Sequence, residues 1–390
     1  MQLTSALPSW NCSNQPVFLR ADLNVPLKDS TILNDRRLQA IRPTLDSLLK
    51  QNAIIVLATH LGRPNNKEDA LSTRHLLPWF EKHEYQITFC ATLDDALAQQ
   101  KTAVPGSILL LENLRFFKEE REGSLSLAHR LAQLADCYVN DAFGALHRHD
   151  TSITLLPKQF APDKRTIGLL VEKELAILSK FLQNPQHPVC IILGGNKISS
   201  KLPMIEHLLT IADHIILCPA IVFTFLKALG KPVGKSIVED EELNTARTIL
   251  HRAPQESCDV HFPVDYQIAQ DSLSGPLSVV PADQLPADSM GISIGPESEK
   301  LFADIIASSK TTFFNGAIGF LDRPETLQGM QSILSAMAHA SGTSLVTGGD
   351  SLAALDQLGI TGITHTITGG GSALAYLSGK TLPGLKPFID

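Results

Sequence analysis

Two lysines four residues apart follow a glycine pair at the end of an apolar run, in the segment 188–201 (PVCIILGGNKISSK). Glycine lets a ligand approach the backbone closely, and Ser199 and Ser200 are placed to open a helix whose first N–H groups attract anions. In a helical turn Lys197 and Lys201 share one face. Two ammonium groups beside free backbone donors suit a polyphosphate. A tight turn with two solvated lysines has the same sequence features, so the rest of the chain must decide.

Glycine tips recur at the ends of apolar runs in the second half. One run ends in Thr347-Gly348-Gly349-Asp350, and another ends in three glycines at 369–371, in both cases directly before a helical pattern. Glycines at helix N-termini form backbone nests that bind phosphate. Asp350 is well placed to hold Mg²⁺, which binds few protein carboxylates and mostly phosphate oxygens. Each tip alone is equally compatible with a plain turn.

Basic side chains follow four short apolar runs of the first half, namely PVFLR, IIVLAT, SILLLE and CYV. Guanidinium groups capture carboxylate and phosphate through paired hydrogen bonds. A single arginine of this kind could instead cap a helix or pair with a surface acid, but recurrence after four runs favours one anion site. The polar residues concerned, with one arginine from the next helical pattern, are Arg20, Asp22, Asn24, Arg37, His60, Arg63, Arg115, His147 and Arg148.

Strands and helices must alternate to position these groups. Helix-period segments at 37–49, 76–80 and 126–134 separate the apolar runs, and such alternation predicts a parallel, doubly wound sheet. Ligands bind such sheets at the carboxyl ends of the strands. The predicted fold class is therefore α/β, with two doubly wound parallel-sheet (Rossmann-like) domains, and a linking helix at about 168–184 marks the boundary between them.

Composition narrows the function. A chain of 390 residues is long enough for two domains, and a net charge of −7 argues against general nucleic-acid binding. The six cysteines are scattered without a CxxC pair, so we expect reduced core residues in a cytoplasmic protein. We expect no signal peptide and no membrane-spanning segment.

Several common motifs are absent or incomplete. The segment 230–236 (GKPVGKS) is one residue short of a Walker A loop and contains Pro232. No GxGxxG opens a helix after a strand, no His, Cys and carboxylate set has zinc-ligand spacing, and there is no GxSxG elbow. What remains is one half that offers arginines and histidines to a small anion and another that offers glycine loops, lysines and a carboxylate to a nucleotide. This asymmetry indicates phosphoryl transfer across a cleft.

Ten segments resemble blocks of the phosphoglycerate kinase family, in that family's order and along nearly the whole chain. They are RADLNVP (20–26), THLGRP (59–64), LLLENLRF (109–116), YVNDAFG (138–144), LGGNKISSK (193–201), FTFLKALG (223–230), PVDY (263–266), IGPES (294–298), TGGDS (347–351) and TGGGSALAYLSGKTLPG (368–384).

The resemblance implies reversible, in-line transfer of the acyl phosphate of 1,3-bisphosphoglycerate to Mg-ADP, giving ATP and 3-phosphoglycerate, when two domains close over a hinge cleft. It implies that the C-terminal tail returns to the first domain, so the predicted domains are 1–167 plus 380–390, which binds 3-phosphoglycerate, and 168–379, which binds the nucleotide. The partners are then small molecules, without nucleic acid or membrane, and the protein is expected to be a monomer.

Site residues follow from the resemblance position by position. Arg37, Lys201 and Gly371 would act on the transferring phosphoryl group, and Asp350 would hold Mg²⁺. The implied substrate-binding residues are Arg20, Asp22, Asn24, Arg37, His60, Arg63, Arg115 and Arg148. The implied nucleotide-binding residues are Gly194, Gly195, Lys197, Lys201, Asn315, Asp322, Gly348, Gly349, Asp350, Ser351, Gly369 and Gly370.

The sequence departs from the family pattern mainly around the nucleotide. Cys218-Pro219-Ala220-Ile221-Val222 replaces a glycine-rich tip, which leaves the base preference open. The smaller departures remove no charge-stabilising group and are interpreted as tuning of nucleotide binding; they are Asn196, Ser200, Phe314, Ala317, Asp322 and Thr347. Two alternatives stay open: a non-enzymatic homologue that binds a phosphometabolite or a protein partner, and another acyl-phosphate kinase with a different small acid.

Overall fold

A computed structural model of the chain describes Leu7 and residues 10–389. The chain divides into two compact units, one drawn from residues 1–176 and 381–390 and the other from residues 177–380. The division falls inside helix α7 (Leu169–Gln183), whereas the sequence analysis places it at residue 168. The ligand expected for each domain stays a prediction.

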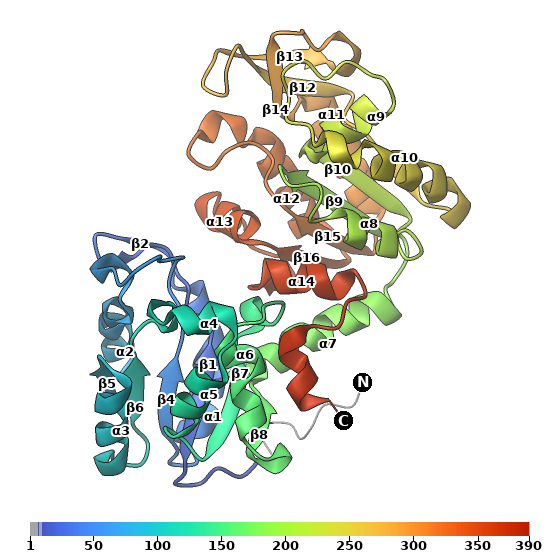
Figure 1. The fold of residues 1–390 in the computed structure, drawn as a ribbon. Helices are drawn as coiled ribbons and strands as arrows, with labels where there is room; N and C mark the ends of the chain where they lie inside the picture. The colour runs from blue at the N-terminus through green and yellow to red at the C-terminus, as the bar shows by residue number, and fades with distance from the viewer. Residues whose placement is uncertain (1–6, 8–9, 390) are drawn as a thin grey trace. The chain divides into compact units, whose positions relative to one another are not determined.

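Unit 1 is built on a six-stranded parallel sheet with the strand order β5-β6-β4-β1-β7-β8 (Figure 1). The chain adds strands on one side of β1 and then on the other, which makes the sheet doubly wound with a switch beside β1. The strands are β1 (Pro16–Ala21), β4 (Ile54–Ala58), β5 (Ile87–Cys90), β6 (Ile108–Leu111), β7 (Cys137–Asp141) and β8 (Arg165–Ile167), with a small hairpin of β2 (Leu27–Lys28) and β3 (Thr31–Ile32).

Helices cover this sheet with their apolar faces. In α1 the residues Leu38, Ile41 and Leu45 recur at helical spacing and share one buried cluster with Leu19 of β1 and Leu57 of β4. The helices of the unit are α1 (Arg36–Leu49), α2 (Leu77–Lys82), α3 (Leu93–Thr102), α4 (Lys118–Glu122), α5 (Leu125–Ala132) and α6 (Thr151–Thr154).

The C-terminal tail belongs to unit 1. Its 3-10 segment η12 (Pro383–Phe388) packs against α6 and β8. The Gly384 N–H donates to the Leu146 carbonyl over 2.9 Å, and the Phe388 ring stacks on Tyr138 with 6.2 Å between ring centroids. Residues from the end of the chain therefore close the core of the first unit.

Unit 2 contains a second six-stranded parallel sheet, ordered β11-β10-β9-β15-β16-β17 (Figure 1). Its switch point lies between β9 and β15, because the chain first builds outward to β11 and then returns. The strands are β9 (Val189–Gly195), β10 (His214–Ala220), β11 (Asp259–His261), β15 (Thr311–Asn315), β16 (Thr343–Thr347) and β17 (His365–Ile367). The helices are α8 (Leu202–Leu208), α9 (Ile221–Ala228), α10 (Leu243–Arg252), α11 (Pro296–Ser308), α12 (Gln328–His339), α13 (Gly349–Gln357) and α14 (Gly370–Leu377).

The sequence predicted both parallel sheets, because their central strands are buried apolar runs. It did not predict a separate antiparallel sheet in unit 2, which has the order β13-β12-β14. The inner positions of these strands alternate with polar ones, so the signal is weaker than a continuous apolar run. Its strands are β12 (Asp265–Gln270), β13 (Leu277–Pro281) and β14 (Ser289–Ile294).

Two local expectations in unit 2 are corrected. The helix expected to open at Ser199 and Ser200 begins instead at Leu202, and these serines lie in the preceding turn. The tip expected at 218–220 is not a loop, because β10 continues to Ala220 and α9 begins at Ile221.

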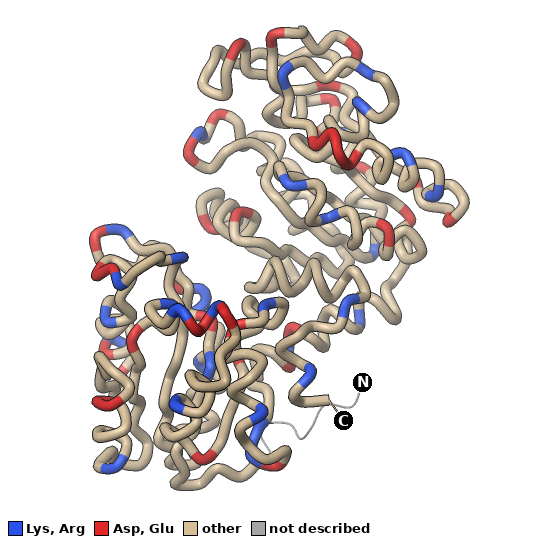
Figure 2. The backbone as a smooth tube through the Cα atoms, in the orientation of Figure 1, with Lys and Arg blue, Asp and Glu red and all other residues tan. Residues whose placement is uncertain are grey.

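The state of the cysteines, the search for membrane-spanning helices and the distribution of charges can each be compared with what the composition suggests. All six cysteines are buried and free, as the sequence predicted. Among the described residues, no helix combines the length and apolar character needed to cross a membrane. Lysines and arginines are interspersed with acidic residues over both units (Figure 2).

Candidate active site

The polar residues of unit 1 gather at one edge of its sheet. Strands β6, β4, β1 and β7 are neighbours in that order, so the side chains that follow them emerge at the same carboxyl edge. Four of these ionisable groups are buried: Arg20 is 0% exposed, Asp22 7%, His60 3% and Arg115 4%. A buried guanidinium requires compensating partners, and these partners define the site.

Arg20 is fixed by an acid that the sequence analysis overlooked. Its Nε donates to Ser152 Oγ over 2.7 Å, and its Nη2 lies 4.0 Å from Glu120 Oε1. Glu120 also accepts hydrogen bonds from the backbone N–H and the hydroxyl of Ser152. Burial raises the Glu120 pKa to about 7, against the opposing effect of Arg20. A short acidic helix, KEERE, gave no sign that one of its glutamates faces the core.

Arg20 also contacts His60, whose Nδ1 lies 3.2 Å from the Arg20 Nη2. Burial lowers the His60 pKa well below its usual range; Asp22 opposes this effect, while Arg20, Arg115 and Arg148 add to it. The imidazole is therefore neutral at physiological pH, and it can donate or accept a hydrogen bond without adding charge.

Asp22 and Arg37 form an ion pair at the end of β1. Arg37 Nη1 donates to Asp22 Oδ1 over 2.6 Å. Burial raises the Asp22 pKa, but the positive charges beside it, that of Arg37 above all, outweigh burial and hold the pKa at about 2. Asn24 is anchored beside this pair, because its Oδ1 accepts the Gly62 N–H over 2.8 Å. The sequence-predicted residues of β1, β4 and α1 thus meet.

Arg115 and Arg148 have unused hydrogen-bonding capacity. The Nε and Nη2 atoms of Arg115 and the Nε of Arg148 are buried without a hydrogen-bond partner. Arg115 Nη2 has only Asp150 nearby, at 4.0 Å. Burial, with Arg148 next, lowers the Arg115 pKa to about 10. Each unsatisfied buried donor carries a desolvation cost of roughly 1–3 kcal/mol, which an incoming anion would relieve.

Two other predicted residues have less central positions. Arg63 is exposed. His147 is half-buried, and burial lowers its pKa, with Arg148 acting in the same direction.

In unit 2 the backbone itself forms the crevice at the switch point. A Cβ on Gly194 would lie 2.4 Å from the Ala317 carbonyl oxygen, and a Cβ on Gly316 would lie 2.1 Å from the Gly194 oxygen. Gly316 also has a φ of 114°. The loops after β9 and β15 therefore pack backbone against backbone, which only glycine permits at these positions.

Lys201 is buried beside this crevice, with 7% of its surface exposed. A Cβ on Gly195 would lie 3.5 Å from the Lys201 Nζ. Burial lowers the Lys201 pKa, while the carboxylates of Glu239 and Asp350 oppose that effect. Lys197 is exposed, and its carbonyl accepts a 3.5 Å hydrogen bond from the Lys201 ammonium. The two lysines are thus close, but their environments differ.

In the turn before α8, backbone N–H groups that the sequence suggested were free donate to the carboxylate of Glu239. Glu239 accepts the Ile198 N–H over 2.6 Å and the Ser199 N–H over 3.3 Å. These N–H groups are therefore occupied, and the prediction that they bind an external anion is corrected. The signal was present in the acidic run VEDEE at 238–242, which the sequence analysis did not use.

The later glycine tips lie together. A Cβ on Gly370 would lie 2.9 Å from the Gly348 Cα, so the N-terminal turns of α13 and α14 are adjacent. The Ser351 hydroxyl exchanges hydrogen bonds with the Gly316 backbone at 2.8 and 3.0 Å. Asn315 Nδ2 donates to the Thr347 carbonyl over 3.0 Å. These polar side chains brace the tips.

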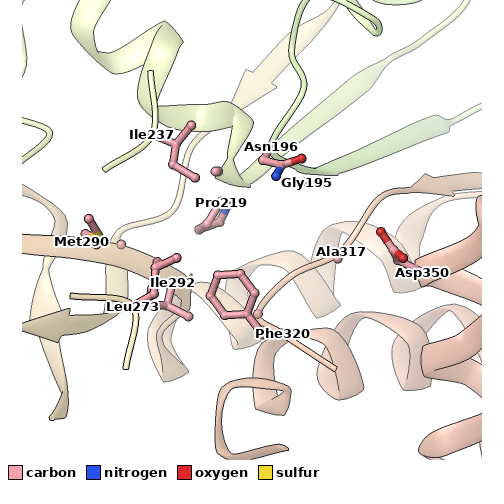
Figure 3. A pocket seen from close by; sticks show the side chains of 13 residues that line it. Gly195, Asn196, Pro219, Ile237, Leu273, Met290, Ile292, Ala317, Phe320 and Asp350 are labelled. Carbon is pink, nitrogen blue, oxygen red and sulfur yellow. The ribbon is translucent and has the colours of Figure 1, made fainter. Parts of the chain in front are cut away.

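A cavity of about 150 Å³ opens next to these tips (Figure 3). Asp350 and Ala317 lie at one end, and Leu273 and Met290 lie at the other, in the view of Figure 3. Mostly apolar walls with a few polar groups at one end are typical of a ligand pocket. The lining residues are Gly195, Asn196, Pro219, Ala220, Ile237, Leu273, Met290, Gly291, Ile292, Ala317, Gly319, Phe320 and Asp350.

Comparison with known proteins identifies the family. The phosphoglycerate kinase family model matches residues 7–380. The chain belongs to the phosphoglycerate kinase family. It is 38% identical over 381 residues to phosphoglycerate kinase of Dictyoglomus turgidum, covering 96% of this chain and 95% of the relative. It is also 38% identical over 390 residues to the chloroplastic phosphoglycerate kinase 2 of Arabidopsis thaliana, covering 97% of this chain and 81% of the relative.

Solved structures of the family have the same fold. Phosphoglycerate kinase from Coxiella burnetii matches with a TM-score of 0.81 at 33% identity, over 98% of this chain and 97% of that chain. The enzyme from Pyrococcus horikoshii matches with a TM-score of 0.82 at 28% identity, over 97% of both chains. The protein is therefore a kinase of two parallel-sheet α/β domains, a transferase of phosphate to and from a carboxyl group and an enzyme of glycolysis.

Some departures from the phosphoglycerate kinase pattern lie at the cavity. Asn196, Pro219, Ala220 and Ala317 all line it. Thr347, by contrast, is buried and donates its hydroxyl hydrogen to the Ile367 carbonyl over 3.2 Å. Four other residues that line the cavity were not predicted from the sequence, because they come from loops and the antiparallel sheet: Ile237, Leu273, Met290 and Phe320.

Proposed function

We propose that the protein catalyses reversible transfer of the acyl phosphate of 1,3-bisphosphoglycerate to Mg-ADP, which gives ATP and 3-phosphoglycerate. Unit 1 binds the glycerate substrate and unit 2 binds the nucleotide. The observation that carries this assignment is a set of three buried guanidinium atoms, Nε and Nη2 of Arg115 and Nε of Arg148, that have no hydrogen-bond partner among the described residues. Guanidinium groups suit phosphate and carboxylate, so a phosphorylated acid fits this edge.

The proposed contacts in unit 1 use the residues that the structure gathers there. Arg20, His60, Arg63, Arg115 and Arg148 receive the phosphate of the glycerate. Asp22 and Asn24 receive its hydroxyl and carboxylate region. Because Asp22 stays ionised and is paired with Arg37, it can accept a hydrogen bond from a substrate hydroxyl.

In unit 2 we assign the phosphates to the glycine tips. Lys197 and the backbone at Gly194, Gly195, Gly348, Gly349, Gly369 and Gly370 bind phosphate oxygens, with Ser351 beside them. The base enters the apolar cavity, and Asn315 and Asp322 lie on the ribose side. Asp350 is exposed at the N-terminus of α13 and lines the cavity, so its carboxylate fits a Mg²⁺–nucleotide. Mg²⁺ held by Asp350 would supply positive charge to neutralise the phosphates.

Phosphoryl transfer requires in-line positioning and neutralisation of charge on the equatorial oxygens. We assign this role to Arg37 from unit 1 and to Lys201 and the Gly371 backbone from unit 2. These groups belong to different units, so we propose that transfer occurs when the units close on their hinge. Closure would also exclude water and protect the acyl phosphate from hydrolysis.

The test is ATP-dependent phosphorylation of 3-phosphoglycerate, coupled to NADH oxidation by an added dehydrogenase. We expect turnover by the wild type and a fall in kcat of about 10²–10³-fold in Lys201→Ala, as for other preorganised charge-stabilising groups. Lys300→Ala is the control, since Lys300 is exposed on α11. Folded wild-type protein without turnover, but with a calorimetric signal for 3-phosphoglycerate, would favour a non-enzymatic binding protein. Turnover with acetate or aspartate instead would indicate another acyl-phosphate kinase.

We further propose that the enzyme acts as a monomer in the cytoplasm. Its buried, free cysteines suit a reducing compartment. Sedimentation of the purified protein and fractionation of the source cells test these two points.

A further inference from the structure

Three potential metal ligands lie together at the amino-terminal edge of the large sheet of unit 2. His214 opens β10 and Asp259 opens β11, and the two residues are partners in the parallel register. His261 is two residues further along β11, so its side chain lies on the same face as that of Asp259. The glycine tips of the nucleotide site follow the opposite, carboxyl ends of the strands, so this cluster is separate from them.

The geometry suits a small tetrahedral ion. His261 Nε2 lies 3.2 Å from His214 Nδ1, and His214 Nδ1 lies 3.9 Å from Asp259 Oδ2. One ligand atom from each of the three residues can be chosen so that all lie within 4.8 Å of one another. Zinc–nitrogen bonds of about 2.0–2.1 Å in a tetrahedron place two nitrogens about 3.3 Å apart. The imidazole pair already has this spacing, and the Asp259 side chain, 77% exposed, is free to rotate inward.

A hydrogen bond between the two rings is the simpler explanation of the 3.2 Å distance, with one ring as donor and the other as acceptor. A hydrogen bond between the rings gives no role to Asp259, although its Oδ2 lies 3.9 Å from the same His214 Nδ1. The nearby Asp213 is engaged elsewhere, because its Oδ2 accepts hydrogen bonds from His187 Nδ1 and from the Val189 N–H, over 2.7 and 2.6 Å. The convergence of three different ligand groups therefore favours an ion.

We propose that His214, Asp259 and His261 bind one divalent transition-metal ion, zinc in particular, with water completing the coordination. Two imidazoles and a carboxylate are ligands that zinc takes readily, and exposure of the cluster leaves room for the water. The ion would join the edge strand β11 to β10 and stabilise that edge. The ligands lie far apart in the sequence, which is why no zinc-ligand spacing is visible there.

The test titrates EDTA-treated, dialysed protein with ZnCl₂ by calorimetry at pH 7.5. We expect saturable binding of one ion per chain and a Tm that rises with zinc concentration. His261→Ala and Asp259→Asn should weaken zinc binding by at least ~10-fold and lose the Tm shift. His251→Ala is the matched control, because His251 is an exposed histidine on α10, and it should bind zinc as the wild type does.

Cobalt provides a second readout, since Co²⁺ in a tetrahedral nitrogen and oxygen site absorbs strongly in the visible range. Wild type with Co²⁺ should show this band, and His261→Ala should lose it while its metal-free Tm stays near that of the wild type. The proposal is overturned if the wild type binds no zinc saturably, or if His261→Ala and Asp259→Asn both bind it as tightly as the wild type. Asp259 is exposed, so Asp259→Asn remains informative even if the histidine variant folds poorly.

Discussion

The two proposed halves of the active site recognise anions in different ways. In unit 1 the binding groups are side chains, and two of them are held by other side chains: Arg20 by Glu120 and Ser152, and Asp22 by Arg37. In unit 2 the binding groups are mostly backbone, shaped by glycines that no other residue could replace at the same spacing.

This contrast fits the two ligands. A small phosphorylated acid with fixed charges can be matched by a rigid set of guanidiniums. A nucleotide carries several phosphates and an apolar base, so it is matched by N–H groups at helix termini and by an apolar cavity. The first site should therefore fail when a charge is removed, and the second when a Cβ is added.

Removing a guanidinium from unit 1 should have the largest effect. Arg115→Ala deletes two buried donor atoms, Nε and Nη2, that have no hydrogen-bond partner among the described residues, so we expect binding of 3-phosphoglycerate to weaken by about 10²-fold, the cost of losing a buried charged contact. ATP binding should stay within about twofold. Calorimetric titration with each ligand separately measures both.

Arg130→Ala is the control for this prediction. Arg130 is exposed on α5 and lies over the Phe117 ring at 5.9 Å, so its loss should leave the affinity for 3-phosphoglycerate unchanged. Equal weakening of ATP and 3-phosphoglycerate binding in Arg115→Ala would break the comparison between the two units.

A Cβ in a glycine tip of unit 2 should have the next largest effect. Gly348 has a φ of 104°, and its added Cβ would lie 2.9 Å from Asn315 Nδ2. We expect Gly348→Ala to weaken ATP binding about tenfold, because backbone strain of roughly 1–3 kcal/mol displaces the N-terminal turn of α13. Binding of 3-phosphoglycerate should not change.

Gly359→Ala tests whether the effect of Gly348→Ala comes from backbone strain in general or from the place of Gly348 in the glycine tip. Gly359 also has a positive φ, of 64°, but a Cβ there would meet nothing within 4 Å. This variant should lose some stability in urea and keep its ATP affinity. If both variants lose ATP affinity equally, general destabilisation would explain the effect and the glycine tip would have no special role.

The two units also differ in how much of their proposed binding sites the sequence predicted. The residues Asp22, His60, Arg115 and Arg148 lie in the loops that follow four neighbouring strands, and the topology rule for parallel sheets places them at one edge. The chain gives no comparable rule for Glu120, Ser152 or Glu239, because their roles depend on long-range packing.

The cavity of unit 2 was the least predictable part. Ile237, Leu273 and Met290 come from segments that carry no motif, and the antiparallel sheet that supplies part of the lining was not predicted. The turn at 198–201 shows a related limit. Its N–H groups were expected to be free, but Glu239, some 40 residues away, occupies two of them.

The buried pair Arg20 and Glu120 predicts a pH effect in unit 1. Burial raises the Glu120 pKa from 4.5 to about 7, so the folded protein binds more protons than the unfolded chain between these values. Its contribution to stability is therefore complete below about pH 4.5 and is lost as the pH rises through 7. Glu120→Gln should remove this dependence of stability on pH. Between pH 4.5 and pH 8 the free energy of unfolding of the variant, relative to that of the wild type, should therefore rise by ~1–3 kcal/mol.

Urea unfolding at several pH values measures this difference. Arg37→Ala gives the opposite sign, since Asp22 has a lowered pKa of about 2, and its contribution is present above the unfolded pKa and lost as the pH falls. A wild-type minus Glu120→Gln difference that stays constant with pH would show that Glu120 remains ionised in the folded protein.

Asp322→Asn should have the smallest effect and tests the limit of carrying residues over by position. Asp322 is exposed in the loop after β15 and is absent from the lining of the cavity, although the family resemblance places it near the ribose. An exposed polar contact contributes at most about 1 kcal/mol, so we expect the Kd for ATP to rise less than fivefold, with no change for 3-phosphoglycerate. Asp271→Asn, at an exposed aspartate in a turn, is the matched control. A loss of ATP affinity above tenfold in Asp322→Asn, but not in Asp271→Asn, would mean that a side chain of unit 2 contributes as much to ATP binding as its glycine tips. The contrast between side-chain recognition in unit 1 and backbone recognition in unit 2 would then apply only to the phosphates.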